Sequence, residues 1–429
     1  MIFKNLKSTI KMENNYKINH FDFWYIFLVT LYFGGSSAAF LGMTYYINNI
    51  SVAIPLIYTI FVFFKYRLEL SYHLITSLVI VLLWFLLQYI YNGYFNIVDC
   101  SFYLYNIIVA FTIINSYGRR FFYIFEKVIY VLAIISIIGW GICLFGGRDI
   151  LASLAPFDGN KIIDGSFGIF SVVNQRSDLE EIYYSVIRNS GFCSEPGHYS
   201  AILCLAIVFN LFFNKFEIKS NRHLWVFLVA LLSTQSTTGY FILGIVVIPL
   251  FLLNNRYRSK WLIYGLSLCG ICLIVTSSVV AQKIEDTQYS EANLYEVVDK
   301  VNGYQEGLVA QRFDSFAIES VNFQENPLIG YGIWQKSFFY NHISPYLRPS
   351  NGCITILAKH GIFIGIIYYF SLVLSCITIS REFQVKGALF LFLLYLCFLF
   401  SYDFQTRNLM LVFVLYRVFK CDEMQKMRE

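Results

Sequence analysis

Charged side chains are scarce in this sequence. Asp, Glu, Lys and Arg make up 14% of its 429 residues, whereas soluble domains carry roughly 25%. Apolar stretches of about 20 residues, long enough to cross a bilayer, recur along most of the chain. The composition therefore excludes an ordinary soluble domain, and we predict an all-α integral membrane protein with many spans.

Several motifs of cytosolic chemistry are also missing. The sequence has no P-loop, no dinucleotide fingerprint, no G-x-S-x-G element and no residues at metal-ligand spacing. Most of its ten Cys lie inside apolar runs, where Cys behaves as a small hydrophobe, so we expect no disulfide framework. The basic residues sit in short loops rather than in one patch, which argues against nucleic acid as a partner. We expect neither a metal nor an organic cofactor.

Apolar segments predict twelve membrane spans. The stretch 223–253 is too long for one span and is interrupted by STQSTTG, so we interpret it as two shorter spans with a polar hairpin at 233–239. The predicted spans are 23–46, 48–64, 72–91, 100–116, 124–146, 197–214, 223–235, 238–253, 261–281, 351–379, 387–402 and 406–419.

The distribution of Lys and Arg orients these spans, because cytoplasmic loops carry an excess of both. Among the short loops, those on one side hold nearly all of the Lys and Arg, so we predict that both termini are cytoplasmic and that two long loops lie outside. The predicted segments are a cytoplasmic tail at 1–22, five spans at 23–146, the first outer loop at 147–196, spans six to nine at 197–281, the second outer loop at 282–350, the last spans at 351–419 and a second tail at 420–429.

The first outer loop ends in RNSGFCSEPGHYSA, where polar residues meet an apolar run. Pro196 suits the first turn of a helix, because its missing N–H would be unpaired there anyway. The start of a helix offers free N–H groups and the positive end of the helix dipole to an anion, and Arg188 stands just upstream. Two interpretations stay open: an anion site, or a helix capped by Glu195 with His198 at the membrane interface.

The second outer loop contains QRFDSFAIESVNFQENPLIGYG. Arg312 opens a predicted amphipathic helix, Asn326-Pro327 ends it, and the glycines after it predict a turn. Arg312 is a candidate phosphate ligand, and the alternative is a salt bridge to Asp314 or Glu319.

The end of the second outer loop, NHISPYLRPSNG, brings His342 and Arg348 to the start of the tenth span. Asn351 is well placed to cap the helix of that span. An outer site with several Arg suits a lipid-linked phosphate or diphosphate. The candidate catalytic residues are Glu195 and His342, and the candidate substrate-binding residues are Arg176, Arg188, His198, Arg312, Arg348 and Asn351.

Three elements together resemble the bacterial O-antigen polymerase and O-antigen ligase superfamily. They are R-x-x-G-x-x-x-E-P at 188–196, S-T-x-S-T-T-G at 233–239 and N-P-L-x-G-x-G at 326–332. The resemblance covers about residues 185–375 in motif and the whole chain in topology. It implies a GT-C-like membrane glycosyltransferase with two large outer loops that needs neither a metal nor a nucleotide.

The resemblance also implies an activity. Polymerases of this superfamily transfer a growing glycan from undecaprenyl diphosphate to an incoming lipid-linked repeat unit, on the periplasmic face of the bacterial cytoplasmic (inner) membrane. Arg188 and Arg312 would hold the diphosphate, and Glu195 would orient the acceptor hydroxyl or act as the base. The implied partners are the lipid-linked oligosaccharide and membrane lipid, and a chain-length regulator is a further candidate.

Two other functions stay open. Ligases of the superfamily transfer the finished chain to lipid A core, and they tend to carry His-Asn before the late span, where this sequence has Ser350-Asn351. A lipid-linked oligosaccharide flippase or a transporter would show charges near the membrane midplane and repeat symmetry. The sequence shows neither the His-Asn pair of ligases nor the midplane charges and repeat symmetry of a transporter. We therefore favour a polymerase of O-antigen, or of a related capsular or exopolysaccharide.

Overall fold

The computed structural model describes residues 18–34, 48–147, 166–167, 170–174, 187–193, 195–254, 312–342 and 351–426. Helices dominate these residues, which confirms the mostly helical fold. The helices are α2 (His20–Gly34), α4 (Asn48–Lys65), α5 (Tyr72–Asn92), α6 (Ile97–Tyr117), α7 (Arg120–Leu144), α9 (Pro196–Phe213), α10 (Arg222–Thr234), α11 (Thr237–Ile242), η3 (Leu243–Val247), α12 (Ile248–Asn254), α16 (Arg312–Glu325), η4 (Trp334–Lys336), α17 (Phe338–His342), α18 (Gly352–Glu382), α19 (Ala388–Ser401) and α20 (Asn408–Lys426).

Six helices in the described part of the chain are long and apolar enough to cross a membrane. They are α5, α6, α7, α9, α18 and the continuous run Thr237–Asn254, which α11, η3 and α12 form together. Three shorter apolar helices accompany them, at Ile54–Lys65, Arg222–Thr234 and Ala388–Ser401. These helices support the predicted multi-pass membrane protein. The predicted span at 261–281 and residues 35–46 of the first predicted span lie outside the described residues.

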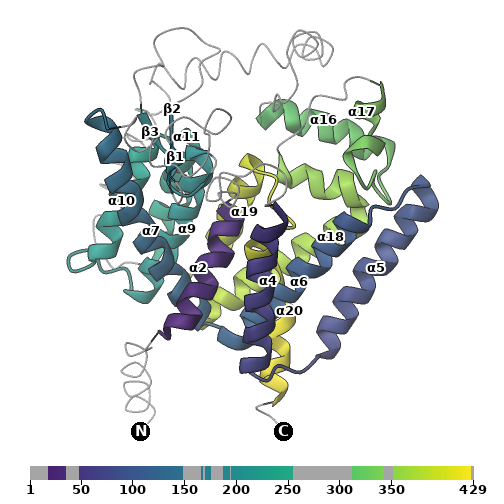
Figure 1. The fold of residues 1–429 in the computed structure, drawn as a ribbon, viewed down its shortest axis with the longest axis horizontal. Coiled ribbons are helices and arrows are strands. Elements are labelled where there is room, and N and C mark those ends of the chain that lie inside the picture. The colour runs from purple at the N-terminus through teal and green to yellow at the C-terminus, as the bar shows by residue number, and fades with distance from the viewer. Residues whose placement is uncertain are drawn as a thin grey trace.

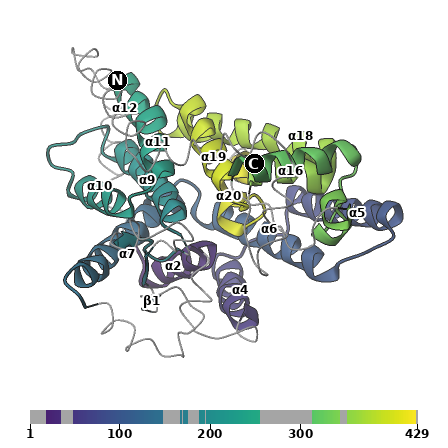
Figure 2. The same cartoon turned by 90° about the horizontal axis from the view of Figure 1, so that it is seen from above.

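The helices stand side by side, and the elements from the two predicted outer loops lie at one end of them (Figure 1). In that view α2 begins and α20 ends at the bottom, whereas the strands, α16 and α17 lie at the top. Seen from above, α7, α9 and α10 gather on one side of the molecule and α5 and α16 on the other (Figure 2). The two outer loops therefore contribute to the same end of the molecule, at different places.

A small antiparallel sheet departs from the all-α prediction. Its strands are β1 (Ser166–Phe167), β2 (Phe170–Asn174) and β3 (Ile187–Asn189), in the order β1-β2-β3. Arg188 of β3 lies opposite Val173 of β2. Strands of two to five residues give too few positions for an alternation of apolar and polar side chains to be recognised in a sequence.

Stacked aromatic rings hold α7, α9 and α20 together. The ring of Phe122 lies 4.5 Å from that of Phe209, and Phe413 lies 6.0 Å from each of them, measured between centroids. These spacings are those that aromatic pairs prefer. Nearly every side chain of α9 is buried, so the core holds the first turn of this helix, at Pro196, in a fixed place at the upper end.

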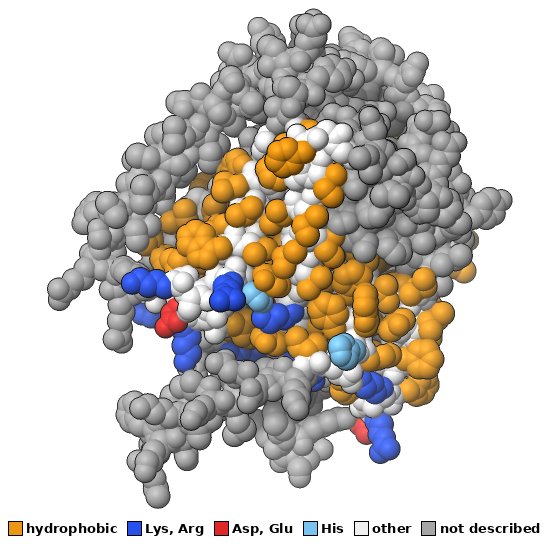
Figure 3. Space-filling model, turned by 60° about the vertical axis from the view of Figure 1, so that its left-hand side comes forward, with side chains coloured by type: hydrophobic (Ala, Val, Ile, Leu, Met, Phe, Trp, Pro, Cys, Tyr) orange, Lys and Arg blue, Asp and Glu red, His pale blue; other side chains and the backbone are white. Residues whose placement is uncertain are grey.

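Ion pairs join the lower ends of the helices. The buried carboxylate of Asp22 lies 2.9 Å from Lys65 Nζ and 3.5 Å from Arg120 Nη2. Glu382 and Lys420 join α18 to α20 at 2.6 Å. On the face drawn in Figure 3, hydrophobic side chains cover the middle of the molecule and Lys and Arg gather along its lower edge. This distribution agrees with lower ends that face the cytoplasm.

The polar segment STQSTTG separates α10 from α11. α10 ends at Thr234, Gln235 takes a left-handed conformation with φ of 47°, and Ser236 caps α11. The hydroxyls of Ser233 and Thr234 each donate to a carbonyl three residues earlier, at 2.7 Å. Local hydrogen bonds therefore satisfy these groups inside an otherwise apolar segment.

Candidate active site

Strand β3 carries Arg188 to the upper end of α10. The guanidinium donates from Nε to the carbonyl of Thr234 across 3.2 Å. The next residue, Asn189, is buried and donates from Nδ2 to the hydroxyls of Ser233 at 2.9 Å and Ser136 at 3.2 Å. Trp140 Nε1 donates to the Ile187 carbonyl at 2.8 Å. Strand β3 is thus tied to both α7 and α10, and Arg188 is held at a defined position.

A tight turn brings the chain from β3 to the start of α9. Asn189 Oδ1 accepts a hydrogen bond from the N–H of Gly191 at 2.8 Å, as in an Asx turn. Gly191 has φ of +53°, and a Cβ there would lie 2.7 Å from the ring of Tyr199. Because an L side chain is disfavoured at that φ and has no space, the glycine of the R-x-x-G element is required by the turn.

Glu195 stands at the start of α9 and acts electrostatically on Arg188. Pro196 stands in the first turn of this helix, and Glu195 precedes it with extended backbone, an exposed side chain and no side-chain cap hydrogen bond. Burial lowers the pKa of the Arg188 guanidinium, while Tyr402, Tyr240 and Glu195 act in the opposite direction. An arginine stays charged under such shifts. The site therefore combines a cation, a carboxylate that acts on it and the N–H groups of a helix start, which have no partner inside the helix.

His198 lies in the same turn but is buried. Its side chain is 1% exposed. Its ring centroid lies 4.0 Å from that of Phe404, 5.0 Å from Tyr402 and 5.9 Å from Phe33. The predicted alternative, in which His198 lies at the membrane interface, does not describe this aromatic environment. Its role as a substrate ligand stays a prediction.

Of the other three predicted arginines, the structure describes the backbone of Arg312 alone. Arg176 and Arg348 lie outside the described residues, and Arg312 is the first residue of α16. α16 lies away from the strands in Figure 1 and in the view from above (Figure 2). Whether Arg312 contributes to the site of Arg188 stays a prediction.

His342 and Asn351 flank the end of the second outer loop. His342 ends α17, is exposed, donates from Nδ1 to the carbonyl of Phe338 at 3.0 Å and stacks on that ring at 4.4 Å. Asn351 caps α18, since its Oδ1 accepts from the N–H groups of Cys353 at 3.1 Å and Ile354 at 3.5 Å. The predicted cap is confirmed, and the oxygen of Asn351 is occupied by it.

The turn 326–332 fills a break in α18. The helix is interrupted at Gly361, which has φ of 74° and ψ of 176°. Three backbone hydrogen bonds join the turn to the break, from the N–H of Tyr331 to the Ala358 carbonyl at 3.0 Å, from Gly332 to Lys359 at 3.0 Å and from Ile362 to Pro327 at 2.8 Å. Backbone groups that the helix no longer pairs are thereby satisfied. The N-P-L-x-G-x-G element is therefore a structural plug between the second outer loop and a late helix.

Glu319 of α16 anchors this turn from the other side. Its side chain is 1% exposed. It accepts from the Tyr331 hydroxyl at 3.0 Å and from Asn322 Nδ2 at 3.3 Å. Burial raises the pKa of the Glu319 carboxyl to about 7, although these two hydrogen bonds act to lower it. The sequence indicated Glu319 only as a partner of Arg312, and this contact was not predicted.

Arg407 is a further candidate site residue, which was not predicted from the sequence. It lies in the short turn 402–407 between α19 and α20, beside the first turn of α9. Its guanidinium donates from Nη1 to the Phe33 carbonyl at 3.3 Å and lies over the ring of Phe404 at 4.6 Å. One sequence signal was present, because an arginine in a short loop predicted to lie outside is an exception to the expected excess of cations on the cytoplasmic side.

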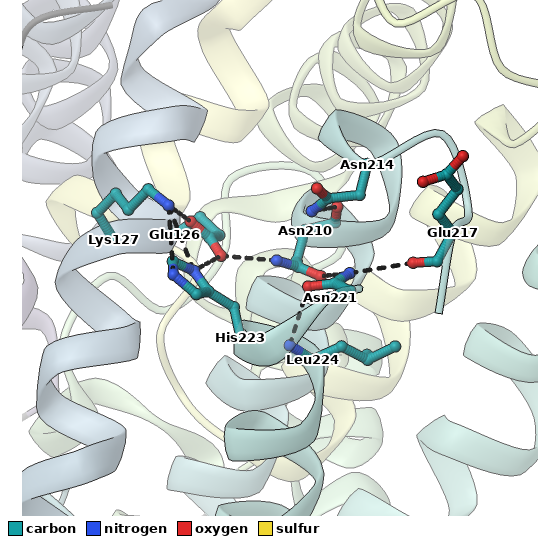
Figure 4. Close-up of polar contacts among 8 residues, drawn as sticks. All are labelled: Glu126, Lys127, Asn210, Asn214, Glu217, Asn221, His223 and Leu224. Atoms are coloured by element: carbon teal, nitrogen blue, oxygen red, sulfur yellow. Dashed lines mark hydrogen bonds and ion pairs between the residues drawn. The ribbon is translucent and has the colours of Figure 1, made fainter. Parts of the chain in front are cut away.

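A separate polar cluster lies at the lower end, where it joins α7, α9 and α10 (Figure 4). The buried carboxylate of Glu126 accepts from Asn210 Nδ2 at 2.8 Å, lies 2.7 Å from His223 Nδ1 and lies 3.6 Å from Lys127 Nζ. Asn221 Nδ2 donates to Asn210 Oδ1 at 2.5 Å. This cluster is distant along all three helices from Arg188. Among the described residues, no group of three or more His, Cys, Asp or Glu is arranged to hold a metal ion.

The apolar helices and the arginine-bearing upper end define a multi-pass membrane protein with a candidate anion site. A family model described as O-antigen ligase matches residues 223–370. The matched segment includes the hairpin at 233–239, the turn at 326–332 and the break at Gly361. This match is consistent with the O-antigen polymerase and ligase superfamily and confirms the resemblance seen in the motifs. The comparison with curated proteins found no match.

Proposed function

We propose that the protein is a repeat-unit polymerase for O-antigen or for a related capsular or exopolysaccharide. It would transfer a growing glycan from undecaprenyl diphosphate to an incoming lipid-linked repeat unit on the outer face of the bacterial inner membrane, without a metal. The observation that carries the proposal is that Arg188 is held at the upper end of α10, where Glu195 at the start of α9 acts on it electrostatically. Both residues adjoin the start of the 223–370 segment that the family model matches, because Arg188 binds the Thr234 carbonyl and Gly197 in the first turn of α9 lies beside Ser236.

The reaction needs stabilisation of a leaving diphosphate. The acceptor hydroxyl oxygen attacks the anomeric carbon, and the bond from that carbon to the phosphate oxygen breaks with its electron pair going to the phosphate. Arg188 and the N–H groups of the α9 start would stabilise this developing charge. A half-buried guanidinium does so more strongly than one in water. Arg176, Arg312 and Arg348 are proposed as further phosphate ligands from the two outer loops.

The acceptor hydroxyl must also lose a proton to a base. Glu195 is the proposed group, but it is exposed and stands at a helix start, which makes a carboxylate a weak base. Bound glycan would have to displace its water before it could take the proton, and otherwise Glu195 orients the hydroxyl. His342 is the second candidate base. His198 and Asn351 are buried, so contact with substrate would require a local rearrangement.

The proposal includes the topology predicted from the sequence, with twelve spans, a GT-C-like arrangement, both termini in the cytoplasm and the active site outside. The cluster of cations at the lower helix ends supports this orientation. A chain-length regulator remains a proposed partner, alongside the lipid-linked oligosaccharide.

An O-antigen ligase is the second candidate, and one observation favours it. The matching family model carries that description. The chemistry at the donor would be the same, but the acceptor would be lipid A core. Ser350-Asn351, where ligases tend to have His-Asn, favours the polymerase.

Surface polysaccharide from a deletion strain, separated on a gel, tests the proposal. Collapse of the ladder to core plus one repeat unit is expected for a polymerase. Bare core, with long chains retained on the carrier lipid, would identify a ligase, and an unchanged ladder would refute both. Complementation with Arg188→Gln or Glu195→Gln should fail at normal protein levels. Arg222→Gln, an exposed arginine at the other end of α10, is the matched control and should restore the ladder.

A further inference from the structure

Arg407 is a half-buried cation without a carboxylate partner in the described part of the chain. Lys65, Lys127 and Lys420, at the lower helix ends, each lie within ion-pair distance of an acid. No carboxylate among the described residues lies that close to Arg407, and Asp403 acts on it only from farther away. Withdrawing a guanidinium from water without a counter-charge is unfavourable. The structure thus leaves this cation available to an anion from outside the chain.

The contacts that Arg407 does make orient it and leave donors to spare. Nη1 binds the Phe33 carbonyl, and the ring of Phe404 covers one face of the guanidinium plane. A guanidinium has five N–H donors in a planar fork. One carbonyl and one ring therefore fix the plane of the fork without using most of its donors.

The same short turn connects Arg407 to the site of Arg188. Phe404, which stacks against Arg407, also packs on His198 in the first turn of α9. Tyr402, two residues earlier, touches Gly197 in that turn and acts electrostatically on Arg188. Arg188 and Arg407 therefore both adjoin the start of α9, although β3 and the α19–α20 turn are far apart in the sequence.

We propose that Arg407 binds a phosphate group of the lipid-linked diphosphate, together with Arg188, at the first turn of α9. This inference rests on the proposed function and extends it, because it assigns a phosphate ligand outside both long loops. A diphosphate offers acceptor oxygens on two phosphorus atoms, so two guanidinium forks can each engage one phosphate. Such binding holds the donor lipid at the membrane surface and neutralises part of the charge of the leaving group.

Binding of undecaprenyl diphosphate to the purified full-length chain in phosphatidylcholine nanodiscs tests this inference. Arg407→Gln is expected to raise the Kd at least about tenfold, because it removes a charged hydrogen-bonding partner. Arg222→Gln should leave the Kd unchanged. The inference would be overturned if the Kd of Arg407→Gln lay within about twofold of the wild-type value instead of rising about tenfold.

Loss of the bond to the Phe33 carbonyl could also impair folding, so a second variant is needed. Arg407→Lys keeps the charge and a donor but loses the planar fork. An intermediate Kd is expected for this variant, and a wild-type Kd would count against the inference even if Arg407→Gln could not be purified.

Two further binding measurements distinguish this inference from its alternatives. Phosphatidylglycerol in the nanodiscs should not displace undecaprenyl diphosphate in an Arg407-dependent manner. If it does, the cation serves an anionic phospholipid headgroup and the inference is wrong. If Arg188→Gln also binds undecaprenyl diphosphate like the wild type, the proposed function fails at its own site. If only Arg188→Gln weakens binding, the proposed function stands and the role of Arg407 is refuted.

Discussion

The hydroxyl of Tyr331 donates a hydrogen bond to the buried carboxylate of Glu319 across 3.0 Å. This contact joins α16 to the turn that plugs the break in α18. Because burial raises the pKa of Glu319 to about 7, the carboxyl gains or loses its proton near neutral pH. The docking of α16, the helix that Arg312 opens, is therefore expected to depend on pH.

The sign of this dependence follows from the raised pKa. The folded state favours the protonated carboxyl of Glu319. This group therefore stabilises the fold below its ordinary pKa, and that stabilisation is lost as pH rises through about 7. We expect hydrogen-exchange protection of α16 to fall from about pH 5 to about pH 8, by roughly 3 kcal/mol at most. Glu319→Gln should abolish this fall. Glu325→Gln, an exposed carboxyl on the same helix, should retain it.

This account of Glu319 would be contradicted if the wild-type protein showed the same hydrogen-exchange protection of α16 across that pH range. The comparison is made after correction for the intrinsic exchange rate. A fall that persists in Glu319→Gln would assign the pH dependence to another group.

A second prediction concerns the glycine of the plug. Gly330 has φ of +77°, and a Cβ there would lie 2.5 Å from the backbone of Lys359. The left-handed conformation alone costs an L residue about 1–2 kcal/mol. Gly330→Ala therefore adds to this strain a clash between the new Cβ and the backbone of Lys359. Gly93, with φ of +67° and no heavy atom within 4 Å of a built Cβ, provides the matched control. Gly93→Ala carries the strain without the clash.

We expect Gly330→Ala to lower the melting temperature in detergent more than Gly93→Ala does, and to shorten the surface polysaccharide at equal protein level. The shorter product follows because the plug aligns the second outer loop with α18. Equal melting temperatures for the two variants would show that the turn 326–332 does not hold the break in α18 closed.

Much of the fold could be predicted because membrane spans leave a signal along a single stretch of sequence. The predicted span 72–91 coincides with α5, and Pro196 begins α9 as expected. A bilayer sets the length of an apolar run, and a helix start has its own residue preferences. Neither signal requires knowledge of which helices are neighbours.

The features that were missed depend on tertiary contacts. The span 351–379 was predicted as continuous, but Gly361 breaks it because a turn from another segment supplies the backbone partners. His198 was expected at the membrane interface or in the site, but the aromatic turn between α19 and α20 buries it. Arg188 and Glu195 were placed together because they are close in the sequence. Arg407 was not, because only the fold brings it to them.

A final prediction separates the lower polar cluster from the proposed chemistry. Glu126 is 2% exposed and serves Asn210 and His223 as a hydrogen-bond acceptor. Glu126→Ala leaves the buried Asn210 and the half-buried His223 without that acceptor, which costs about 2–4 kcal/mol. We expect a lower melting temperature in detergent, with the activity of each folded molecule retained. The activity should survive because the cluster lies at the opposite end of α10 from Thr234, where Arg188 binds.

Glu217→Ala is the matched control, because Glu217 lies beside the same cluster with an exposed side chain and contributes only its backbone carbonyl to Asn221 (Figure 4). It should melt like the wild-type protein. If Glu126→Ala instead kept the wild-type melting temperature and lost polymer, the cluster would act in the reaction rather than in stability. That result would require the lower end of α7, α9 and α10 to communicate with the first turn of α9, and the nearly complete burial of α9 offers a direct physical route for it.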